Sequence, residues 1–472
     1  MILEQIYTGC LAQGAYYIES DGEAAVIDPL REVRSYIEKA ERSKAKIKYV
    51  FETHFHADFV SGHLDLARKT GAVIVYGPTA APGFDALVAA DGQEFPLGRI
   101  RIRLLHTPGH TMESSCFLLI DEAGKETALF TGDTLFIGDV GRPDLAQKVQ
   151  ADLTPERLAA LLFDSLHKKI LPLADEIIIY PAHGAGSACG KNMSNETTDT
   201  LGHQKATNYA LQPALSKDAF IKEVLSGLTS PPAYFPSNVL LNSKGYDNIE
   251  KVMERGKHAL EPAAFDFAAN ETNALILDTR DPEIFCEGHI PNSINIGING
   301  NFAPWVGTLI PDIRQEILIV SEAGREEEVI TRLARVGYDY SIGYLKGGFE
   351  AWEKAGLETD QVACITVESL MQEMEKGKIN ILDVRKESEY RSEHVQGAEN
   401  VPLDYVNENM QKVNRNENYY VHCAGGYRSV IFISILKARG YKNLVNISGG
   451  FRALKESGLF KLTEYARPAT ML

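Results

Sequence analysis

Short apolar runs alternate with polar or glycine-bearing turns through the first half of the chain. The runs lie at 24–28, 47–51, 72–76, 100–105, 116–120, 128–130 and 176–180. Apolar runs of roughly four to eight residues bounded by turn residues predict buried strands. Almost every run ends in a polar or histidine-bearing turn, and functional side chains gather on such loops. The pattern therefore predicts a sheet-based α/β domain over 1–255 with its site on the loops that leave the strands.

A helical pattern follows at about 205–228. Pro231 and Pro232 then begin a polar run that reaches Gly256. We expect this run to form a lid and a linker, because two prolines and many polar residues do not favour a continuous helix.

The second half of the chain contains one repeat with a period of about 105 residues. Leu-Asp-x-Arg at 277–280 returns at 382–385, and Gly-Gly-Phe at 347–349 returns at 449–451. The period is too long for a solenoid unit. It predicts two tandem copies of one small α/β domain, at 262–358 and 362–472. Polar residues shared by the copies are expected to pair inside each fold: Asp278, Arg280 and His289, with Asp383, Arg385 and His394.

Length, charge and cysteine content narrow the class of function. The 472 residues agree with three domains at roughly 150 residues each. The 48 basic and 64 acidic residues give a formal charge of −16, which disfavours nucleic acid and membrane surfaces as partners. Neither a signal-like N-terminus nor a run of about 20 apolar residues is present, so we expect a cytoplasmic protein. Six cysteines without a short-spaced pair predict reduced thiols.

Histidines and carboxylates follow the predicted strands in a set that is typical of a metal centre. The set comprises His54, His56 and Asp58 after the run at 47–51, His110 in Thr-Pro-Gly-His, Asp133 in Thr-Gly-Asp-Thr, and His183 in Pro-Ala-His-Gly. Neutral imidazoles and carboxylates at several strand ends are the ligands that a first-row divalent metal needs.

Over about residues 1–250 these motifs resemble those of the metallo-β-lactamase superfamily. The resemblance implies an αββα sandwich, and the superfamily includes both hydrolases and oxidoreductases, so the fold alone does not choose the chemistry. Phe59 stands where the binuclear hydrolases of the glyoxalase II type carry a histidine for a second metal. Because a phenyl ring offers no lone pair, we expect one metal ion per chain.

A single ion on His54, His110 and Asp133 would have the two-histidine, one-carboxylate arrangement that suits Fe(II) and O₂. This looks like the persulfide dioxygenases, in which Fe(II) oxidises the outer sulfur of a low-molecular-weight persulfide and releases sulfite and thiol. The resemblance places three residues around the ligands, where they orient ligands, water or substrate: His56, Asp58 and His183.

Three nearby residues bear on the substrate. The resemblance implies that Arg142 supports the anionic persulfide, and a loop ion pair with Asp139 or Asp144 is the alternative. Ala185 stands where the glutathione-using branch typically has tyrosine, which makes coenzyme A or bacillithiol reasonable carrier thiols. Cys189 is expected to be a buried small residue rather than a sulfur carrier.

The last domain contains one cysteine in a reactive context. Cys423 follows a strand and precedes a helix in the sequence His-Cys-Ala-Gly-Gly-Tyr-Arg-Ser. Backbone N–H groups at a helix start stabilise a thiolate. The segment resembles the rhodanese active-site loop, which implies that Cys423 carries sulfane sulfur and that Arg428 holds sulfite or thiosulfate. Glu322 occupies this position in the earlier copy, so we expect that copy to be inactive.

The sequence therefore predicts an α/β protein, an αββα metallo-β-lactamase sandwich followed by an inactive and an active rhodanese-like domain. The predicted function is sulfide detoxification, with a persulfide dioxygenase that uses one Fe(II) per chain and a sulfurtransferase that makes or uses thiosulfate. Two alternatives remain: a zinc-dependent thioester hydrolase with a sulfur-carrier domain, and a sulfur relay to a partner protein. A homodimer or homotetramer is expected.

Overall fold

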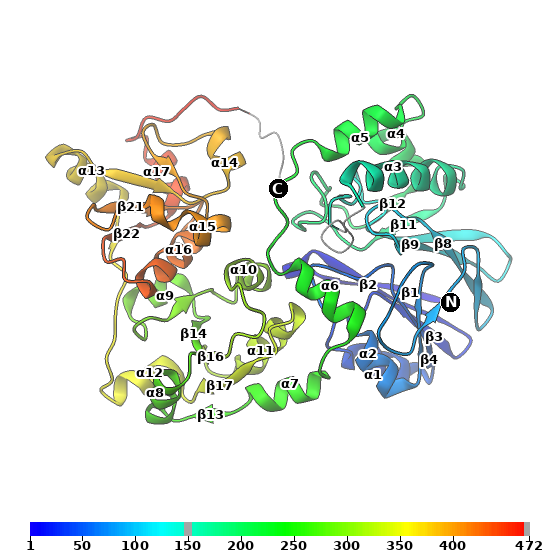
Figure 1. Ribbon diagram of the computed structural model, residues 1–472, viewed down its shortest axis with the longest axis horizontal. Helices are drawn as coiled ribbons and strands as arrows, with labels where there is room; N and C mark the ends of the chain where they lie inside the picture. The colour runs from blue at the N-terminus through cyan, green and yellow to red at the C-terminus, as the bar shows by residue number, and fades with distance from the viewer. Residues whose placement is uncertain (146–152, 467–472) are drawn as a thin grey trace. The chain divides into compact units, whose positions relative to one another are not determined.

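The computed structural model describes residues 1–145 and 153–466 (Figure 1). The chain divides into two compact units, the first at residues 1–249 and the second formed by most of the remainder. No helix among the described residues is long and apolar enough to cross a membrane.

The first unit contains two six-stranded sheets. One sheet consists, in spatial order, of β1 (Ile2–Thr8), β2 (Gln13–Ser20), β3 (Glu23–Ile27), β4 (Lys46–Phe51), β5 (Val73–Tyr76) and β6 (Leu87–Val88). The other consists of β12 (Asp199–Thr200), β11 (Ile178–Pro181), β10 (Glu126–Gly132), β9 (Ser115–Ile120), β8 (Ile100–His106) and β7 (Glu94–Leu97). Strands β3 to β6 run parallel, as do β10 and β11, and the remaining pairs are antiparallel.

Successive side chains of β2 alternate between two hydrophobic cores, one on each face of the sheet. Tyr16 and Ile18 point into a core between the two sheets, while Ala15 and Tyr17 point into a core beneath the helices. A strand with both faces buried is expected when helices cover the outside of each sheet. The αββα architecture is confirmed.

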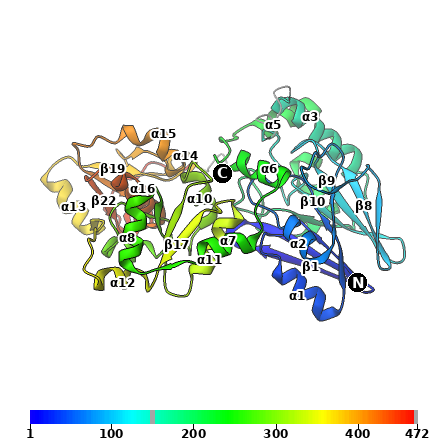
Figure 2. The ribbon, with the colours of Figure 1, turned by 60° about the horizontal axis from the view of Figure 1, so that its bottom comes forward.

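Helices cover the outer face of each sheet, and both views show the two groups on opposite sides (Figures 1 and 2). The helices of the first group are α1 (Arg34–Ser43) and α2 (His63–Thr70), and those of the second are α3 (Pro155–Ser165), α4 (Leu201–Thr207) and α5 (Lys217–Leu225). Pro213 lies between α4 and α5, so the single helical stretch predicted at 205–228 is wrong.

Two further helices, α6 (Phe235–Lys244) and α7 (Ile249–Gly256), occupy the segment that we expected to be a linker. The segment is helical although its composition is polar, because two of the three buried residues of α6 are asparagines and the third is Phe235. Asn238 and Asn242 are both inaccessible to solvent. Such a helix has a weak hydrophobic period.

The second unit contains two five-stranded parallel sheets with the same strand order. The first is β13 (Ala259–Leu260), β17 (Ser341–Leu345), β16 (Ile317–Val320), β14 (Leu275–Asp278) and β15 (Ile294–Asn295). The second is β18 (Cys364–Ile365), β22 (Leu444–Ile447), β21 (Tyr419–His422), β19 (Asn380–Asp383) and β20 (Glu399–Asn400). The internal repeat therefore corresponds to two copies of one fold.

The described residues of each copy form five α-helices. The first contains α8 (Pro262–Glu271), α9 (Pro282–Glu287), α10 (Phe302–Leu309), α11 (Glu326–Arg335) and α12 (Gly348–Lys354). The second contains α13 (Val367–Lys376), α14 (Glu387–Ser392), α15 (Val406–Asn409), α16 (Tyr427–Ala438) and α17 (Gly450–Ser457). Arg280 and Arg385 each form a bidentate pair with the aspartate two residues earlier, as expected for groups that stabilise the fold.

Helix α16 is buried on all sides over residues 429–436. It packs against its own strands β21 and β22, and also against α9 and β15 of the first copy. The backbone N–H of Asn295 in β15 donates to Ser434 Oγ of α16 at 3.0 Å. The two copies thus share one packed boundary along α16.

Candidate active sites

The loop after β4 brings three of the predicted metal-site residues together: His54, His56 and Asp58. Asp28, at the end of β3, fixes the start of this loop by accepting hydrogen bonds from the backbone N–H and the hydroxyl of Thr53, both at 2.8 Å. Gly132 packs against Thr53 with φ +51°, and a Cβ there would lie 2.6 Å from the threonine side chain. The close approach at the end of β10 places the next residue, Asp133, opposite the loop.

His54, His110 and Asp133 form a buried cluster whose ligand atoms lie within 4.8 Å of one another. Asp133 Oδ2 is 3.9 Å from His54 Nε2 and 3.3 Å from His110 Nε2. The other ring nitrogen of each histidine is engaged, by Thr53 Oγ1 for His54 at 3.0 Å and by the carbonyl of Arg142 for His110 at 2.9 Å. These contacts orient both Nε2 atoms toward the carboxylate.

The cluster fits a divalent metal ion. Both carboxylate oxygens of Asp133 are buried and accept no hydrogen bond from the described residues. Burial, and then the neighbouring histidines, hold the pKa of His54 well below its usual range, so its imidazole is neutral and has a lone pair to donate. Unpaired buried oxygens are costly, and a cation at this point would satisfy them.

His56 is not part of this cluster, and its Nε2 faces two acidic side chains. Its Nε2 lies 3.1 Å from Asp28 Oδ1 and 3.6 Å from Glu52 Oε2. Burial lowers its pKa, but the Asp28 carboxylate outweighs burial and raises the pKa to about 9. The Phe59 ring packs on the imidazole with a centroid distance of 4.3 Å. His56 is therefore packed between two acidic side chains and an apolar ring.

Asp58 and His183 lie on the other side of Asp133. His183 Nε2 is 3.4 Å from Asp58 Oδ2 and 3.6 Å from Asp133 Oδ1. Together with His56 they form a second group at ligand distance, and Cys189 forms a third with Asp133 and His183. Burial, followed by the nearby carboxylates, raises the pKa of the Cys189 thiol well above its usual range. Cys189 is thus buried, as expected, but beside the metal centre.

Two residues that the sequence analysis missed hold the metal loop in place. Asn242 of α6 donates to the carbonyls of His56 and Phe59 at 2.8 and 2.7 Å and accepts from the N–H of Ser61. Tyr234 donates to the carbonyl of Asp58 at 3.1 Å. Neither contact leaves a sequence signal, because only the folded chain brings α6 to the loop.

The Arg142 guanidinium is engaged within its own loop region. It donates to both carboxylate oxygens of Asp144 at 2.7 and 2.8 Å and to the carbonyls of Ala188 and Thr229. This geometry matches the alternative of a loop ion pair. The link of Arg142 to the metal centre is its carbonyl, which orients His110.

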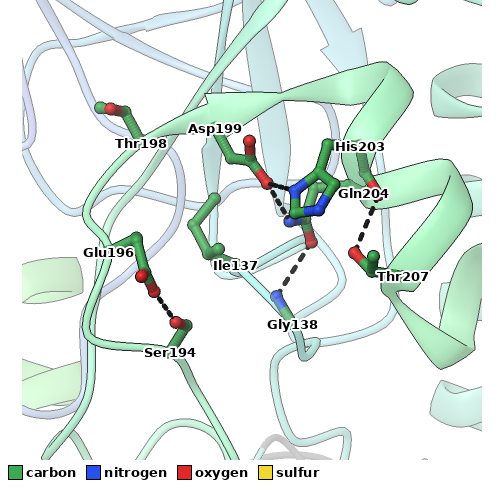
Figure 3. A pocket seen from close by; sticks show the side chains of 9 residues that line it. All are labelled: Ile137, Gly138, Ser194, Glu196, Thr198, Asp199, His203, Gln204 and Thr207. Carbon is green, nitrogen blue, oxygen red and sulfur yellow. Dashed lines mark hydrogen bonds and ion pairs between the residues drawn. The ribbon is translucent and has the colours of Figure 1, made fainter.

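A shallow pocket of about 250 Å³ opens elsewhere in the first unit (Figure 3). Its polar side chains bond to one another: His203 and Gln204 both contact Asp199, and Ser194 contacts Glu196. None of its lining residues belongs to the metal cluster. The pocket therefore contributes no reactive group.

The segment 423–428, which we call the sulfur loop, connects β21 to α16. Cys423 is buried, and the N–H of Gly426 donates to its Sγ at 3.1 Å. Gly426 has φ +114°, which turns that N–H toward the sulfur. The Gly-Gly-Phe motif supports the loop from behind, since the N–H of Phe451 donates to the Cys423 carbonyl at 2.7 Å. This arrangement supplies a backbone hydrogen-bond donor to the sulfur atom of Cys423.

Arg428 is predicted to hold an anion. Its guanidinium has the geometry for two parallel hydrogen bonds, but in this structure a protein carboxylate accepts both. Its two terminal nitrogens donate to the Glu389 carboxylate of α14 at 2.5 and 2.9 Å. Burial raises the pKa of Glu389, but Arg428 outweighs it and holds the pKa below its usual range. An incoming anion has to share or displace this carboxylate.

In the first copy, Glu322 lies in the corresponding loop between β16 and α11. Arg325 pairs with its side chain at 3.6 Å, and the first turn of the following helix holds three glutamates, Glu326, Glu327 and Glu328. This loop presents negative charge where the second copy presents a thiol.

The first copy nevertheless touches the sulfur loop. Tyr427 donates to the carbonyl of Gly297 at 2.7 Å, and its ring lies so close to Gly300 that a Cβ there would be 2.4 Å from Tyr427 Cζ. Tyr427 stands between Gly426 and Arg428. The first copy therefore contacts the residue that joins Gly426, whose N–H contacts Cys423, to Arg428.

Comparison with known proteins agrees with the division of the chain into a unit that contains the metal cluster and a unit of two repeated copies. Residues 8–183 match the metallo-beta-lactamase superfamily, and residues 262–355 and 366–457 match the rhodanese-like domain. Hydroxyacylglutathione hydrolase GloC of Haemophilus influenzae is 30% identical over 195 residues, which cover 37% of this chain and 85% of that protein. The chain belongs to the metallo-β-lactamase superfamily, and two rhodanese-like domains follow its metallo-β-lactamase fold.

Two further proteins are similar to this chain. The crystal structure of a metallo-beta-lactamase from Staphylococcus aureus is similar with 33% identity and a TM-score of 0.65, over 73% of this chain and 98% of that one. The cytoplasmic hydroxyacylglutathione hydrolase of Arabidopsis thaliana is 36% identical over 28% of this chain. The chain spans only 53% of the length of that enzyme.

Proposed function

We propose that the first unit oxidises the outer sulfur of a low-molecular-weight persulfide with O₂, at one Fe(II) held by His54, His110 and Asp133. The balanced reaction takes one persulfide, one O₂ and one water to one thiol, one sulfite and two protons. The second unit then transfers sulfane sulfur through Cys423.

The packing of the Phe59 ring against His56 carries this proposal. Phe59 stands at the sequence position where binuclear hydrolases carry a ligand of the second metal. The His56 imidazole is paired with Asp28. Three protein ligands leave several coordination positions open, as O₂-dependent Fe(II) centres require. A metal pair, as in binuclear hydrolases, would lack a ligand here.

When bound, the iron supplies the activation of O₂ and a coordination position for the persulfide. The chain positions the reactants: Thr53 and the Arg142 carbonyl hold the two imidazoles, and burial of Asp133 keeps bulk water from the carboxylate. Asn242 fixes the backbone of the loop that carries His54.

At the sulfur loop, sulfite attacks the outer sulfur of a Cys423 persulfide. The S–S bond breaks, thiosulfate leaves, and Cys423 Sγ retains the electron pair, which the N–H of Gly426 stabilises. The reverse direction, in which thiosulfate loads Cys423 and then a carrier thiol, uses the same groups.

The second candidate is a zinc-dependent thioester hydrolase with a sulfur-carrier domain. It is favoured by the relatives named hydroxyacylglutathione hydrolase and by the second group of ligand-type residues, His56, Asp58 and His183. Ala185 argues against glutathione as the thiol, so coenzyme A and bacillithiol persulfides should be compared with glutathione persulfide.

Metal content and O₂ uptake distinguish the two candidates. Protein purified without oxygen and given Fe(II) should hold about one iron per chain and consume O₂ with a persulfide. A matched variant, Phe59→His, should bind more metal without gaining O₂ uptake. Two tightly held zinc ions in the parent protein, together with thioester hydrolysis that exceeds O₂ uptake, would refute the proposal.

A further inference from the structure

Two cysteines that are distant in the sequence meet where the two rhodanese-like copies join. Cys286 lies in α9 of the first copy, and Cys364 opens β18, the edge strand of the second sheet. The N–H of Val362 donates to the carbonyl of Cys286 at 3.0 Å, which holds the incoming strand against α9. Cys364 lies two residues after Val362, so this backbone contact brings the two cysteine-bearing segments side by side, and each thiol shifts the pKa of the other.

The two thiols differ in exposure and in acidity. Cys364 is exposed, whereas Cys286 is buried. The hydrogen bond from Cys286 lowers the pKa of Cys364 to about 7 against the opposing effect of burial, and the Asn446 amide assists. The same contact raises the pKa of Cys286. An accessible thiolate backed by a protonated thiol is the arrangement of an attacking and a resolving cysteine.

We propose that Cys286 and Cys364 form a redox-active pair that closes to a disulfide by exchange with the S–S bond of a low-molecular-weight disulfide or persulfide. The Cys364 thiolate attacks one sulfur of that bond, and the other sulfur leaves with the electron pair and takes up a proton. Cys286 then loses its proton and attacks Cys364 Sγ, which expels the second sulfur compound. The two protein thiols lose two electrons, and the reagent is reduced to two thiols, or to a thiol and hydrogen sulfide.

A chain of polar contacts joins this pair to the sulfur loop. Asn446 Nδ2 lies 3.7 Å from Cys364 Sγ, and Asn446 Oδ1 lies 2.8 Å from Ser429 Oγ. Ser429 Oγ is 3.0 Å from the carbonyl of Gly426, whose N–H contacts Cys423. Formation of the disulfide removes the Cys364 thiolate that Asn446 contacts. A shift of Asn446 then acts through Ser429 on Gly426, whose N–H contacts Cys423.

Peptide mapping of the full-length protein tests the proposal. One sample is treated with 2-hydroxyethyl disulfide and another with cysteine persulfide; both are then alkylated and digested with trypsin without a reductant. Trypsin places Cys286 in peptide 281–314 and Cys364 in peptide 355–376, each with a single cysteine. We expect the two peptides to be joined with the loss of two hydrogens in both samples, and hydrogen sulfide to be released only in the second.

Matched variants separate the two steps. Cys286→Ser should stop at a stable adduct on Cys364, and Cys364→Ser should leave Cys286 unmodified because it is buried. Cys10, which is partly exposed, is the internal control and should react more slowly than Cys364. Absence of the joined peptides while Cys364 carries an adduct, or equal reactivity of all three thiols, would overturn the proposal. The pair contains no metal ligand, so it should also close in Asp133→Ala protein, whatever the outcome for the proposed oxidation.

Discussion

Replacement of Gly300 by alanine tests whether the first rhodanese-like copy positions the sulfur loop of the second. The new Cβ would lie 2.4 Å from Tyr427 Cζ, 2.5 Å from Cε2 and 2.8 Å from the hydroxyl oxygen. Ordinary carbon contacts are about 3.5–4.0 Å, so the tyrosine ring has to move by about 1 Å. The backbone of Gly300 does not have a positive φ, so the effect comes from the contact alone.

The size of the effect follows from two terms. Displacement of the ring weakens the hydrogen bond from Tyr427 to Gly297, which contributes about 1 kcal/mol. Overpacking of the contact adds about 1–3 kcal/mol. The free energy of unfolding of the second unit should therefore fall by about 2–4 kcal/mol. Because Tyr427 adjoins Gly426 and Arg428, a displacement of about 1 Å there should slow sulfur transfer by a factor on the order of 10–100.

Thiosulfate formation from sulfite and a persulfide donor measures this effect, with chemical denaturation as the measure of stability. Gly377→Ala is the matched control, because a Cβ at that position meets nothing within 4 Å. O₂ uptake should be unchanged in both variants, since the metal cluster belongs to the other unit. A folded Gly300→Ala protein that makes thiosulfate at the parent rate would show that the first copy does not position the loop.

Four other changes should have separable outcomes. Cys423→Ser should abolish thiosulfate formation while sulfite accumulates, because a hydroxyl cannot carry sulfane sulfur; ion chromatography that finds thiosulfate at the parent rate would contradict this. Asp133→Ala should lose both iron and O₂ uptake, and retention of stoichiometric iron by elemental analysis would contradict the ligand assignment. Glu322→Ala should leave both rates nearly unchanged, because its loop has no nucleophile; a large loss in the folded variant would indicate a substrate contact. Alkylation of Cys364 should rise with pH and be half-maximal near pH 7, and Cys286→Ala should move the profile to higher pH by removing the hydrogen-bond donor.

The layers of the fold and the metal cluster could be predicted because both leave local patterns in the sequence. Strand β4 is a short apolar run, and the histidine-rich loop follows it directly, so strand and ligands were predicted together. Helix α6 could not be, because two of its buried residues are asparagines, and asparagine is usually an exposed residue. Asn242 donates to two backbone carbonyls of the distant metal loop and accepts from one backbone N–H there.

Side-chain pairing was harder to predict than backbone placement. The position of Arg428 after Cys423 follows from the loop motif, but its bond to Glu389 depends on how α14 packs. Cys286 and Cys364 carry no motif at all. Their contact arises only because the two copies pack against each other, which a single sequence does not reveal.

The burial of α16 on every side makes the last copy an incomplete domain. Its own sheet covers one face, and α9 and β15 of the first copy cover another. Released from its neighbour, the helix would expose apolar side chains to water, and such patches promote aggregation. We therefore expect the pair of copies, and not the last copy alone, to be the smallest fragment of this unit that folds. The copy that has Glu322 in place of a cysteine covers the helix that follows Cys423, so we expect truncation between the two copies to remove any activity of Cys423 even though Cys423 and Arg428 survive.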